Sequence, residues 1–347
     1  MRVAILEYLS GGGWRDSHHR IPAELLAEGQ AMANAIAEAL QVHPGVFPVL
    51  AVDPSLDTIP RVASGATHRI QPDRWWEDWL ELAKLADWTI LIAPESQMLM
   101  SELSGRLRAE GARLLVSSAK ALQHFGDKWD TYRHWQANGL QTIPTCLADD
   151  WSIRQASEGW NLPEPFLSLQ SGWVLKARHG AGCDASRWTL DLHQLQSWVD
   201  ELNDPTQWIV QPRLLGQPGS IHFFGANAAP FPDSGQLPSG WKLFGPCSQI
   251  IHWPEQAIEY HGGQFPWKDG PTPSLMQPLS ACLYLPDAFL LGWIGVDFLW
   301  LPGPSISLPL EVNARGTSAF LPLHHQLGHH LGNWLGAQLL AGPREGV

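Results

Sequence analysis

Three polar residues near the end of the chain alternate with apolar ones in the stretch "LPLEVNARG", positions 308–316. They are Glu311, Asn313 and Arg315, at every second position. Successive side chains of a β-strand point to opposite faces, so this spacing would put all three polar groups on one face. Burying such a row is costly unless something binds it. The stretch therefore predicts a ligand site.

An upstream stretch, "GWIGVDFLW" at 292–300, has the pattern of a partner strand and carries Asp297. The intervening "LPGPS" supplies turn residues, so the two strands are predicted to form a hairpin. This hairpin would bring Asp297, Glu311 and Asn313 together. Two carboxylates and an amide oxygen form a hard oxygen set that suits Mg²⁺, especially when phosphates supply further ligands.

Lysine is scarce in this chain, which has only six, so the position of each is informative. Lys176 lies in the apolar strand-like stretch "WVLKA" and precedes a glycine-bearing loop, "RHGAGC". A lysine there faces either a bound anion or a carboxylate of the protein. The glycine loop favours the anion, because flexible backbone can bring N–H groups close to phosphate.

The other glycine-rich stretch, "GGG" at 11–13, is a weaker signal. It follows a strand-like run but lacks the G-x-G-x-x-G spacing of dinucleotide sites, and no Walker A sequence occurs. A nicotinamide site is therefore disfavoured. A ligand near the end of this first strand, beside Glu7 and Tyr8, is still expected in an open α/β sheet.

Composition narrows the class of protein. The 347 residues are 44% hydrophobic and 16% charged, as in core-rich globular proteins of two or three domains. A formal net charge of −12 opposes a broad grip on nucleic acid or an anionic membrane, so small-molecule ligands are expected. No apolar run approaches a membrane span. The four cysteines lack paired metal spacing, which fits a reducing cytoplasm.

The order of predicted elements divides the chain into three parts. Strand-like and helix-like stretches alternate through 1–120, including a last strand-like run at 112–118, and predict an α/β domain with a parallel sheet. Residues 121–210 form an α+β module, which opens with a single helical pattern that Gly139 ends. Residues 211–347 hold strand-like pieces joined by Pro- and Gly-rich connections, and the stretch 226–280 has no clear pattern.

Taken in order, these stretches resemble the ATP-grasp ligases over nearly the whole chain. The resemblance is carried by "DKWDTYRHWQANGLQTIPT", "VLKARHGAGC", "WIVQPRLLG" and the pair "GVDFLW" and "LPLEVNARGTS". It implies an ATP-grasp fold, α/β and α+β, behind an N-terminal Rossmann-like pre-ATP-grasp domain. It also implies ATP and Mg²⁺ as cofactors.

The resemblance assigns roles by matching positions. It implies nucleotide contacts from Lys128 and Lys176, and a lid over the phosphates made by Gly180, Ala181 and Gly182. It implies an adenine hinge made by Gln211, Pro212, Arg213 and Leu214. It implies magnesium ligands at Asp297, Glu311 and Asn313, and catalytic roles for Lys176 and Arg315.

Two positions depart from the family pattern. Many members hold the ribose hydroxyls with an acidic residue after the hinge, where this chain reads "GQPGS" and offers Gln217. Members like D-alanine–D-alanine ligase place an arginine two residues before the first metal carboxylate, where this chain has Gly295. Arg315 is then the candidate that steadies negative charge, and its alternative role is an ion pair with Glu311.

The implied chemistry is amide formation. Carboxylate is a poor acyl donor, so its attack on the γ-phosphate of ATP would give an acyl phosphate, with Mg²⁺ and the lysines neutralising phosphate oxygens. An amine would then attack the activated carbonyl, and Arg315 would stabilise the oxyanion.

A narrower resemblance, to the tyramine–glutamate ligase group of methanofuran biosynthesis, rests on "AILEYLSGGG" and "LIAPES". It implies a carboxylate such as glutamate joined to a tyramine-like amine. Substrate contacts would then come from Glu7, Tyr8, Gly11, Gly12, Glu95, Ser96 and, from the opposite side, Arg315.

Two other readings stay open: another ATP-grasp amino-acid or dipeptide ligase, and a non-catalytic ATP-binding regulator. The cluster "HHQLGHH" at 324–330 is expected on an exposed helix and not at a metal, and Cys183 is expected to be a packing residue. No oligomer interface can be identified, so a homodimer is left open.

Overall fold

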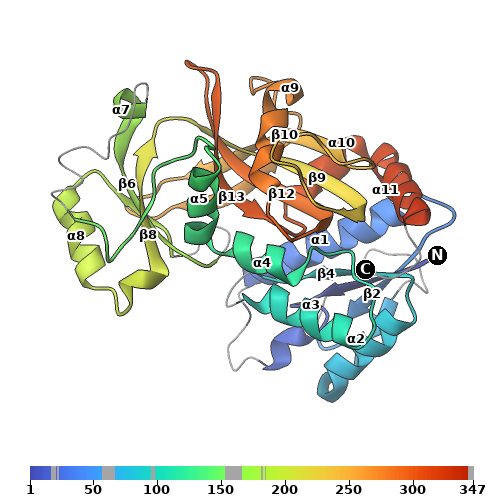
Figure 1. The fold of residues 1–347 in the computed structure, drawn as a ribbon. Coiled ribbons are helices and arrows are strands. Elements are labelled where there is room, and N and C mark those ends of the chain that lie inside the picture. The colour runs from blue at the N-terminus through green and yellow to red at the C-terminus, as the bar shows by residue number, and fades with distance from the viewer. Residues whose placement is uncertain are drawn as a thin grey trace.

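Three β-sheets organise the protein in the computed structural model, which describes residues 1–16, 21, 23–56, 67–94, 98–152, 166–180, 183 and 185–342. In Figure 1 a small sheet lies at the left, the largest sheet in the upper middle and a parallel sheet at the lower right. Within those residues no helix is both long and apolar enough to cross a membrane.

The first sheet is parallel and has the order β3-β2-β1-β4, made of β1 (Arg2–Glu7), β2 (Phe47–Val52), β3 (Thr67–Arg69) and β4 (Trp88–Ile92). Its central strand β1 buries both faces. Ala4 and Leu6 belong to one core cluster with Trp79 and Leu103, whereas Val3 and Ile5 belong to another. This explains the continuous apolar run, because parallel strands are covered on both sides.

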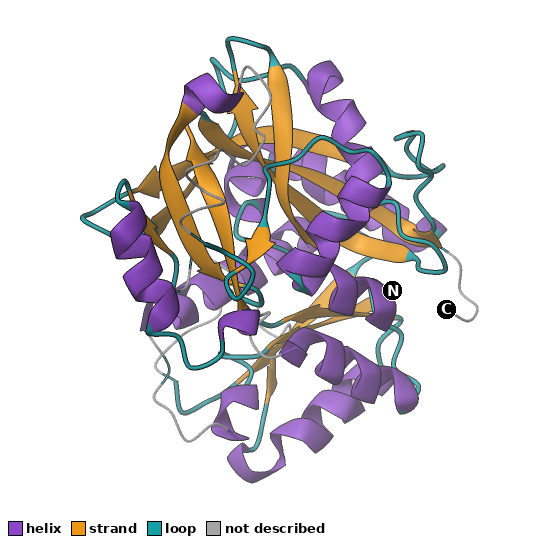
Figure 2. Ribbon diagram, turned by 60° about the vertical axis from the view of Figure 1, so that its left-hand side comes forward, coloured by secondary structure: helices purple, strands orange, loops and turns teal. Residues whose placement is uncertain are grey.

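Helices cover the two faces of this sheet (Figure 2). α1 (Ala23–Gln41) contributes to the cluster with Val3 and Ile5, while α2 (Trp75–Lys84) and α3 (Leu99–Ala109) contribute to the other. The alternation predicted for 1–120 is therefore present. The strand predicted at 112–118 is wrong, because only Leu114 forms a bridge there, with Thr89. The short strand β3 was not predicted.

Two helices, α4 (Ala119–Gly126) and α5 (Lys128–Ala137), stand where the sequence predicted one. Asp127 between them adopts a β conformation, with φ −104° and ψ 105°. Its carboxylate accepts hydrogen bonds from the backbone N–H groups of Trp129 and Asp130, and so caps α5. The prediction missed that an aspartate inside a helical pattern can start a second helix.

The small sheet is antiparallel and has the order β5-β8-β6-β7, made of β5 (Cys146–Leu147), β6 (Gln170–Ala177), β7 (Arg187–Thr189) and β8 (Trp208–Leu214). α7 (Phe166–Leu169) precedes β6, and α8 (Leu192–Asp200) packs on the sheet. The core between α8 and the sheet contains Leu175, Leu195, Trp198 and Val210.

The large sheet is antiparallel and has the order β11-β10-β9-β12-β13. Its strands are β9 (Gln217–Ala229), β10 (Lys242–His252), β11 (Glu259–Gln264), β12 (Leu290–Leu301) and β13 (Ile306–Asn313). The stretch 226–280 thus supplies β10, β11 and the short α9 (Pro273–Met276).

Two C-terminal helices, α10 (Phe320–Leu327) and α11 (His329–Ala341), pack against α1 and tie the large sheet to the first one. Gly328, with φ +47°, separates them, so the histidine cluster spans a helix break. Four 3-10 helices complete the described elements: η1 (Gly13–Asp16), η2 (Pro72–Arg74), η4 (Pro205–Gln207) and η5 (Gln277–Leu283).

Candidate active site

The predicted hairpin is present as β12 and β13, and it places the predicted metal ligands together. Asp297 pairs directly with Glu311, and Gly295 pairs with Asn313. The Asn313 side-chain amide donates to Asp297 Oδ2 at 3.2 Å, and Gln249 of β10 donates to Asp297 Oδ1 at 2.9 Å. Directly opposed residues share one face of an antiparallel pair, so the three groups converge as the alternation predicted.

Two lysines from other elements reach this hairpin. The Lys128 ammonium, at the start of α5, lies 3.4 Å from Glu311 Oε2 and donates to the Gly180 carbonyl at 2.6 Å. The charge of Lys176, on β6, acts on Glu311 from the small sheet and also repels Lys128. Glu311 is therefore the carboxylate on which both cations converge.

A structural ion pair fixes Lys128 in place. Arg178 donates to both carboxylate oxygens of Asp127, the cap of α5, at 2.6 to 2.9 Å. The backbone N–H of Lys128 donates to the Arg178 carbonyl at 3.1 Å. A bidentate arginine–carboxylate contact fixes orientation as well as distance. It holds the first turn of α5 against the end of β6, so both lysines face the hairpin.

The surroundings drive the two carboxyl groups in opposite directions. Burial acts to raise the pKa of Glu311, but the charges of Lys128 and Lys176 outweigh it and hold that pKa below its usual value. Burial, followed by the charge of Glu311, raises the pKa of Asp297 well above its usual value. Burial also lowers the pKa of Lys176, against the pull of Glu311. Positive and negative side chains therefore lie close together in a site that is only partly exposed to solvent.

The donor set of this hairpin fits Mg²⁺. Asp297 and Glu311 repel each other, and a cation between them would relieve that repulsion. The carboxylates and the Asn313 amide are hard ligands, and Mg²⁺ commonly completes its shell with phosphates and water. The described part of the chain contains no cluster of three His, Cys, Asp or Glu side chains placed for a metal.

The residues predicted as the adenine hinge lie on β8, and their side chains make structural contacts. Gln211 is buried and donates to Thr145 Oγ1 at 2.7 Å. The Arg213 guanidinium lies over the rings of both Trp188 and Trp253, 4.6 and 4.4 Å from their centroids, and these two rings meet edge-on. Trp188 lies on β7 and Trp253 follows β10, so this cluster joins the small and large sheets. The sequence pattern gave no signal for it.

The remaining hinge positions are also part of the packing. Pro212 pairs with Trp173 across β8 and β6, and Leu214 is buried against Leu299 and Phe166. Gln217 is exposed at the start of β9. A nucleotide base in this position would meet the backbone of the hinge more than its side chains.

The glycine loop is described only in part. Gly180 has φ +136°, a conformation that favours glycine, and its carbonyl meets Lys128. Ala181 and Gly182 lie outside the described residues. Burial raises the pKa of the Cys183 thiol to about 11, with Glu311 adding to the effect. A thiol with so high a pKa is a poor nucleophile.

The substrate residues predicted in the first domain are held by their own loop. Glu7 is buried and accepts hydrogen bonds from the backbone N–H of Leu9 at 3.1 Å and from the N–H and hydroxyl of Ser10 at 2.6 and 2.5 Å. Burial raises the pKa of Glu7. Gly29 of α1 packs so closely that a Cβ there would lie 2.5 Å from Glu7 Oε1.

The neighbours of Glu7 in this loop are similarly engaged. The Gly11 carbonyl accepts from Trp79 Nε1 at 2.8 Å, and Gly12 has φ +92° against Ile70. The Tyr8 ring packs edge-on against Trp75. Glu95 and Ser96 lie outside the described residues. The structure therefore brings Lys128, Lys176, Asp297, Glu311 and Asn313 together, and it gives Glu7 hydrogen-bond partners within the first domain.

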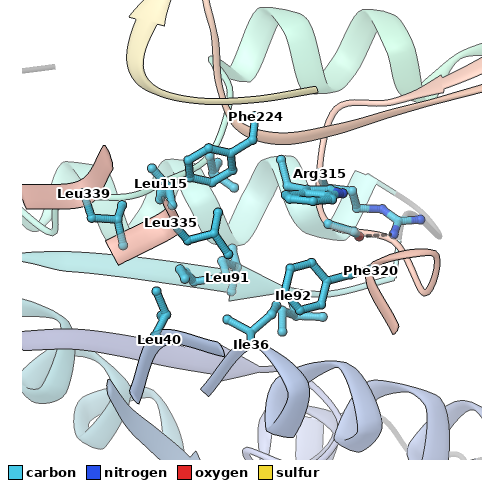
Figure 3. Close-up of a pocket in the computed structure, with 14 residues that line it drawn as sticks. Ile36, Leu40, Leu91, Ile92, Leu115, Phe224, Arg315, Phe320, Leu335 and Leu339 are labelled. Carbon is cyan, nitrogen blue, oxygen red and sulfur yellow. Dashed lines mark hydrogen bonds between the residues drawn. The ribbon is translucent and has the colours of Figure 1, made fainter. Parts of the chain in front are cut away.

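Arg315 begins the loop that leaves β13. It donates to the Gly316 carbonyl at 3.0 Å, and its side chain lies at one end of a cavity between the first and large sheets (Figure 3). Ser318 of the same loop donates to the Tyr260 hydroxyl of β11 at 3.5 Å. Gln249 and Tyr260 are candidates that sequence reasoning missed, because they lie in the stretch 226–280, where no pattern was evident.

Two models of known protein families match this chain. The model of the ATP-grasp domain matches residues 125–319, more than half of the chain, and that of the pre ATP-grasp 3 domain matches residues 47–122. The chain belongs to the ATP-grasp family. The predicted fold, an ATP-grasp fold behind a pre-ATP-grasp domain, is thereby confirmed.

Solved structures agree on the fold of this ATP-grasp chain. An ATP-grasp superfamily protein from Archaeoglobus fulgidus has a TM-score of 0.65 at 17% identity, covering 99% of this chain and 88% of that one. The ADP complex of N5-carboxyaminoimidazole synthetase from Staphylococcus aureus has 0.60 at 13%, covering 99% and 78%. D-alanine–D-alanine ligase from Bacillus anthracis has 0.60 at 14%, covering 98% and 96%. No curated protein matches the sequence.

Proposed function

We propose that this ATP-grasp protein is an ATP- and Mg²⁺-dependent carboxylate–amine ligase that works through an acyl phosphate. The observation that carries the proposal is the convergence of Lys128 and Lys176 on Glu311, beside Asp297 and Asn313. Carboxylates that would hold Mg²⁺ lie next to lysines that would hold phosphate oxygens. Catalysis, more than simple binding, needs the metal and the phosphate held in fixed positions next to each other.

The chain's own residues supply positioning and charge for each step. Lys128 and Lys176 neutralise oxygens of the transferred phosphate, which lowers the barrier to attack by another anion. Asp297, Glu311 and Asn313 would hold Mg²⁺, which supplies Lewis-acid polarisation of the phosphate. The α5 cap and the Arg178–Asp127 pair keep Lys128 in register with the hairpin.

The proposed reaction balances in two steps. A carboxylate oxygen of the acid attacks the γ-phosphorus of ATP, the bond to the β-phosphate oxygen breaks, and ADP leaves. The amine nitrogen then attacks the carbonyl carbon of the acyl phosphate and loses a proton, and inorganic phosphate leaves. Arg315, two residues beyond Asn313, is the proposed partner of the oxyanion in this second step.

Substrate identity is the finer part of the proposal. The N-terminal stretches that resemble the tyramine–glutamate ligase group make glutamate with a tyramine-like amine the first pair to assay. Another amino-acid or dipeptide ligase is the nearest alternative. Both share the hairpin and the two lysines, so the hairpin does not favour one over the other.

A panel assay tests the function directly. The protein is incubated with ATP, Mg²⁺ and pairs from a panel of acids and amines, ADP release is recorded, and products are identified by mass spectrometry. The expected result is ADP release that needs both substrates, with an amide as product. ADP formation with an ester or thioester product would overturn the amide assignment. Tight ATP binding without turnover for any pair would instead support the non-catalytic regulator.

A further inference from the structure

An apolar cavity of about 50 Å³ lies between the first sheet and the large sheet (Figure 3). One wall is α1 and β4, and the opposite wall is β9, β12 and α11. The cavity is therefore formed only where the pre-ATP-grasp domain meets the ATP-grasp domain. Its main lining side chains are Ile36, Leu40, Ile92, Phe224, Trp293 and Leu335.

The lining determines what this cavity can hold. One water molecule needs roughly 10–15 Å³ and two to four polar partners. The cavity offers several times that space, but Arg315 is the only charged residue in its lining. Apolar cavities of this kind stay dry and take up hydrocarbon groups. A branched aliphatic chain suits it, whereas a carboxylate or ammonium group inside it would be desolvated without a partner.

The residues at the rim of the cavity indicate which substrate would enter it. Arg315 and Gly316 lie on that rim, directly after the hairpin that ends at Asn313. Figure 3 shows the Arg315 guanidinium pointing away from Leu335 and Leu339, so the aliphatic stem borders the cavity and the charge lies outside it. A ligand with its tail in the cavity would place its polar head near that charge.

Tyr260 links this rim to the hairpin. Its hydroxyl accepts a hydrogen bond from Ser318 in the Arg315 loop, and the charges of Asp297 and of Glu28 on α1 both act on it. Met32, one turn after Glu28, faces Gly316, since a Cβ there would be 3.7 Å from its terminal methyl group. The loop that carries Arg315 is thus tied to β11 through Ser318, and it contacts α1 through Met32.

We infer that this cavity binds the apolar side chain of the acid substrate, whose carboxylate faces Arg315 and the phosphate site. The inference rests on the proposed ligase function, because it names the class of acid that the ligase would activate. The Arg315 guanidinium attracts a carboxylate and repels an ammonium group, which assigns the cavity to the acid and not to the amine. Glutamate, the first acid to assay under the proposed function, would have to bury its second carboxylate among aliphatic side chains, so this inference ranks apolar acids ahead of it.

Two variants change the cavity in opposite directions. Leu335→Phe places a larger side chain on α11 and makes the cavity smaller. The kcat/KM for a branched acid is therefore expected to fall by about tenfold or more, while activity with a short acid is retained. Ile36→Ala places a smaller side chain on α1 and makes the cavity larger, so the substrate preference is expected to move to acids with longer apolar chains. Ile5→Ala is the matched control, because Ile5 is buried in the same core cluster but does not line the cavity. It is expected to lower stability without changing the order of preference.

The acid panel contains leucine, 4-methylpentanoate and glutamate, each with a range of amines. Leucine and 4-methylpentanoate share the tail and differ in the α-amino group, so their comparison shows whether that group is recognised. Activity is read as ADP release. Binding without ATP is read as a rise in Tm, because a ligand that binds only the folded state stabilises it. Affinity for a nonhydrolysable ATP analogue is expected to be the same in all three variants.

The outcomes separate this inference from the ligase proposal. ADP release with glutamate but not with apolar acids would overturn the inference and leave the ligase intact. A rise in Tm with apolar acids that Leu335→Phe abolishes, with no ADP release for any pair, would support the cavity assignment and overturn the ligase. An unchanged order of acids in both Leu335→Phe and Ile36→Ala would overturn the inference. If Leu335→Phe does not fold, Ile36→Ala and its control decide.

Discussion

Asp297 and Glu311 are directly paired across β12 and β13, yet the pKa of Asp297 is raised and that of Glu311 is lowered. Both are half-buried in the hairpin. Burial acts to raise the pKa of Glu311, but the charges of Lys128 and Lys176 outweigh it and lower that pKa. Burial, and then the charge of Glu311, raises the pKa of Asp297 well above its usual value. The two pKa values differ in direction because Lys128 and Lys176 approach the hairpin next to Glu311. Glu311 is therefore the residue that links the lysines to the predicted metal ligands.

Glu311→Gln is expected to lower kcat on the order of 100-fold or more, since it keeps the shape but removes the charge that holds cation and lysines together. The Tm is expected to change by little, because the amide retains hydrogen bonding. The matched control is Glu259→Gln at an exposed position of β11, which is expected to keep wild-type activity. Full turnover in Glu311→Gln would contradict the assignment of the hairpin.

Lys176→Met is expected to weaken binding of a nonhydrolysable ATP analogue by roughly tenfold or more, because a charge-assisted contact to phosphate is lost. Met keeps the length and apolar stem of the side chain. Calorimetry in the presence of Mg²⁺ measures the affinity. Lys120→Met, on the exposed surface of α4, serves as the control. Equal affinity in the Lys176 variant and the wild type would remove this lysine from the proposed nucleotide site.

Gly29→Ala is expected to destabilise the protein by about 1–3 kcal/mol, although alanine favours helices. The new Cβ would lie 2.5 Å from Glu7 Oε1 and 2.7 Å from its carboxyl carbon, and Glu7 is locked by Leu9 and Ser10. Gly105→Ala in α3 is the control, because nothing lies within 4 Å of its Cβ position. That variant is expected to gain about 0.5–1 kcal/mol. Chemical denaturation of both variants gives the comparison, and equal stabilisation would mean that Glu7 is free to move.

His222 gives the folded state a pH dependence of defined sign. It is fully buried on β9, where its ring stacks on Trp293 and its Nε2 lies 3.1 Å from Ser220 Oγ. Burial lowers the pKa of its imidazole from 6.5 to about 3. The unfolded chain therefore binds a proton that the folded chain does not, between these two pH values. Protonation of His222 therefore leaves the free energy of unfolding unchanged above pH 6.5 and lowers it progressively as the pH falls toward 3.

His222→Gln is accordingly expected to lose stability less steeply than wild type between about pH 6 and pH 4, by up to about 1.4 kcal/mol per pH unit. Urea unfolding across that range measures the slopes. His325→Gln, at an exposed position of α10, is expected to keep the wild-type slope. Parallel curves for wild type and His222→Gln would show that His222 protonates in the folded state as easily as in the unfolded one.

The sequence by itself determined the parts of this protein that depend on local geometry. The period of two in "LPLEVNARG" and the turn residues before it placed Asp297, Glu311 and Asn313 on one hairpin, because strand alternation needs only neighbouring residues. The scarcity of lysine and the apolar strand around Lys176 located a cation for that hairpin. Alternating strands and helices gave the parallel sheet of the first domain, and the ordered motifs gave the family.

Tertiary structure alone decided the features that join distant segments. Gln249 and Tyr260 reach the hairpin and its loop from β10 and β11, whose sequence shows no regular period. Glu7 lies where the first strand ends, as expected, but the packing of Gly29 and the bonds from Ser10 give its carboxylate partners inside the domain. The cavity below Arg315 needs side chains from α1, β4, β9, β12 and α11 at once. Contacts between elements far apart in the chain depend on how whole surfaces pack, and no local spacing encodes them.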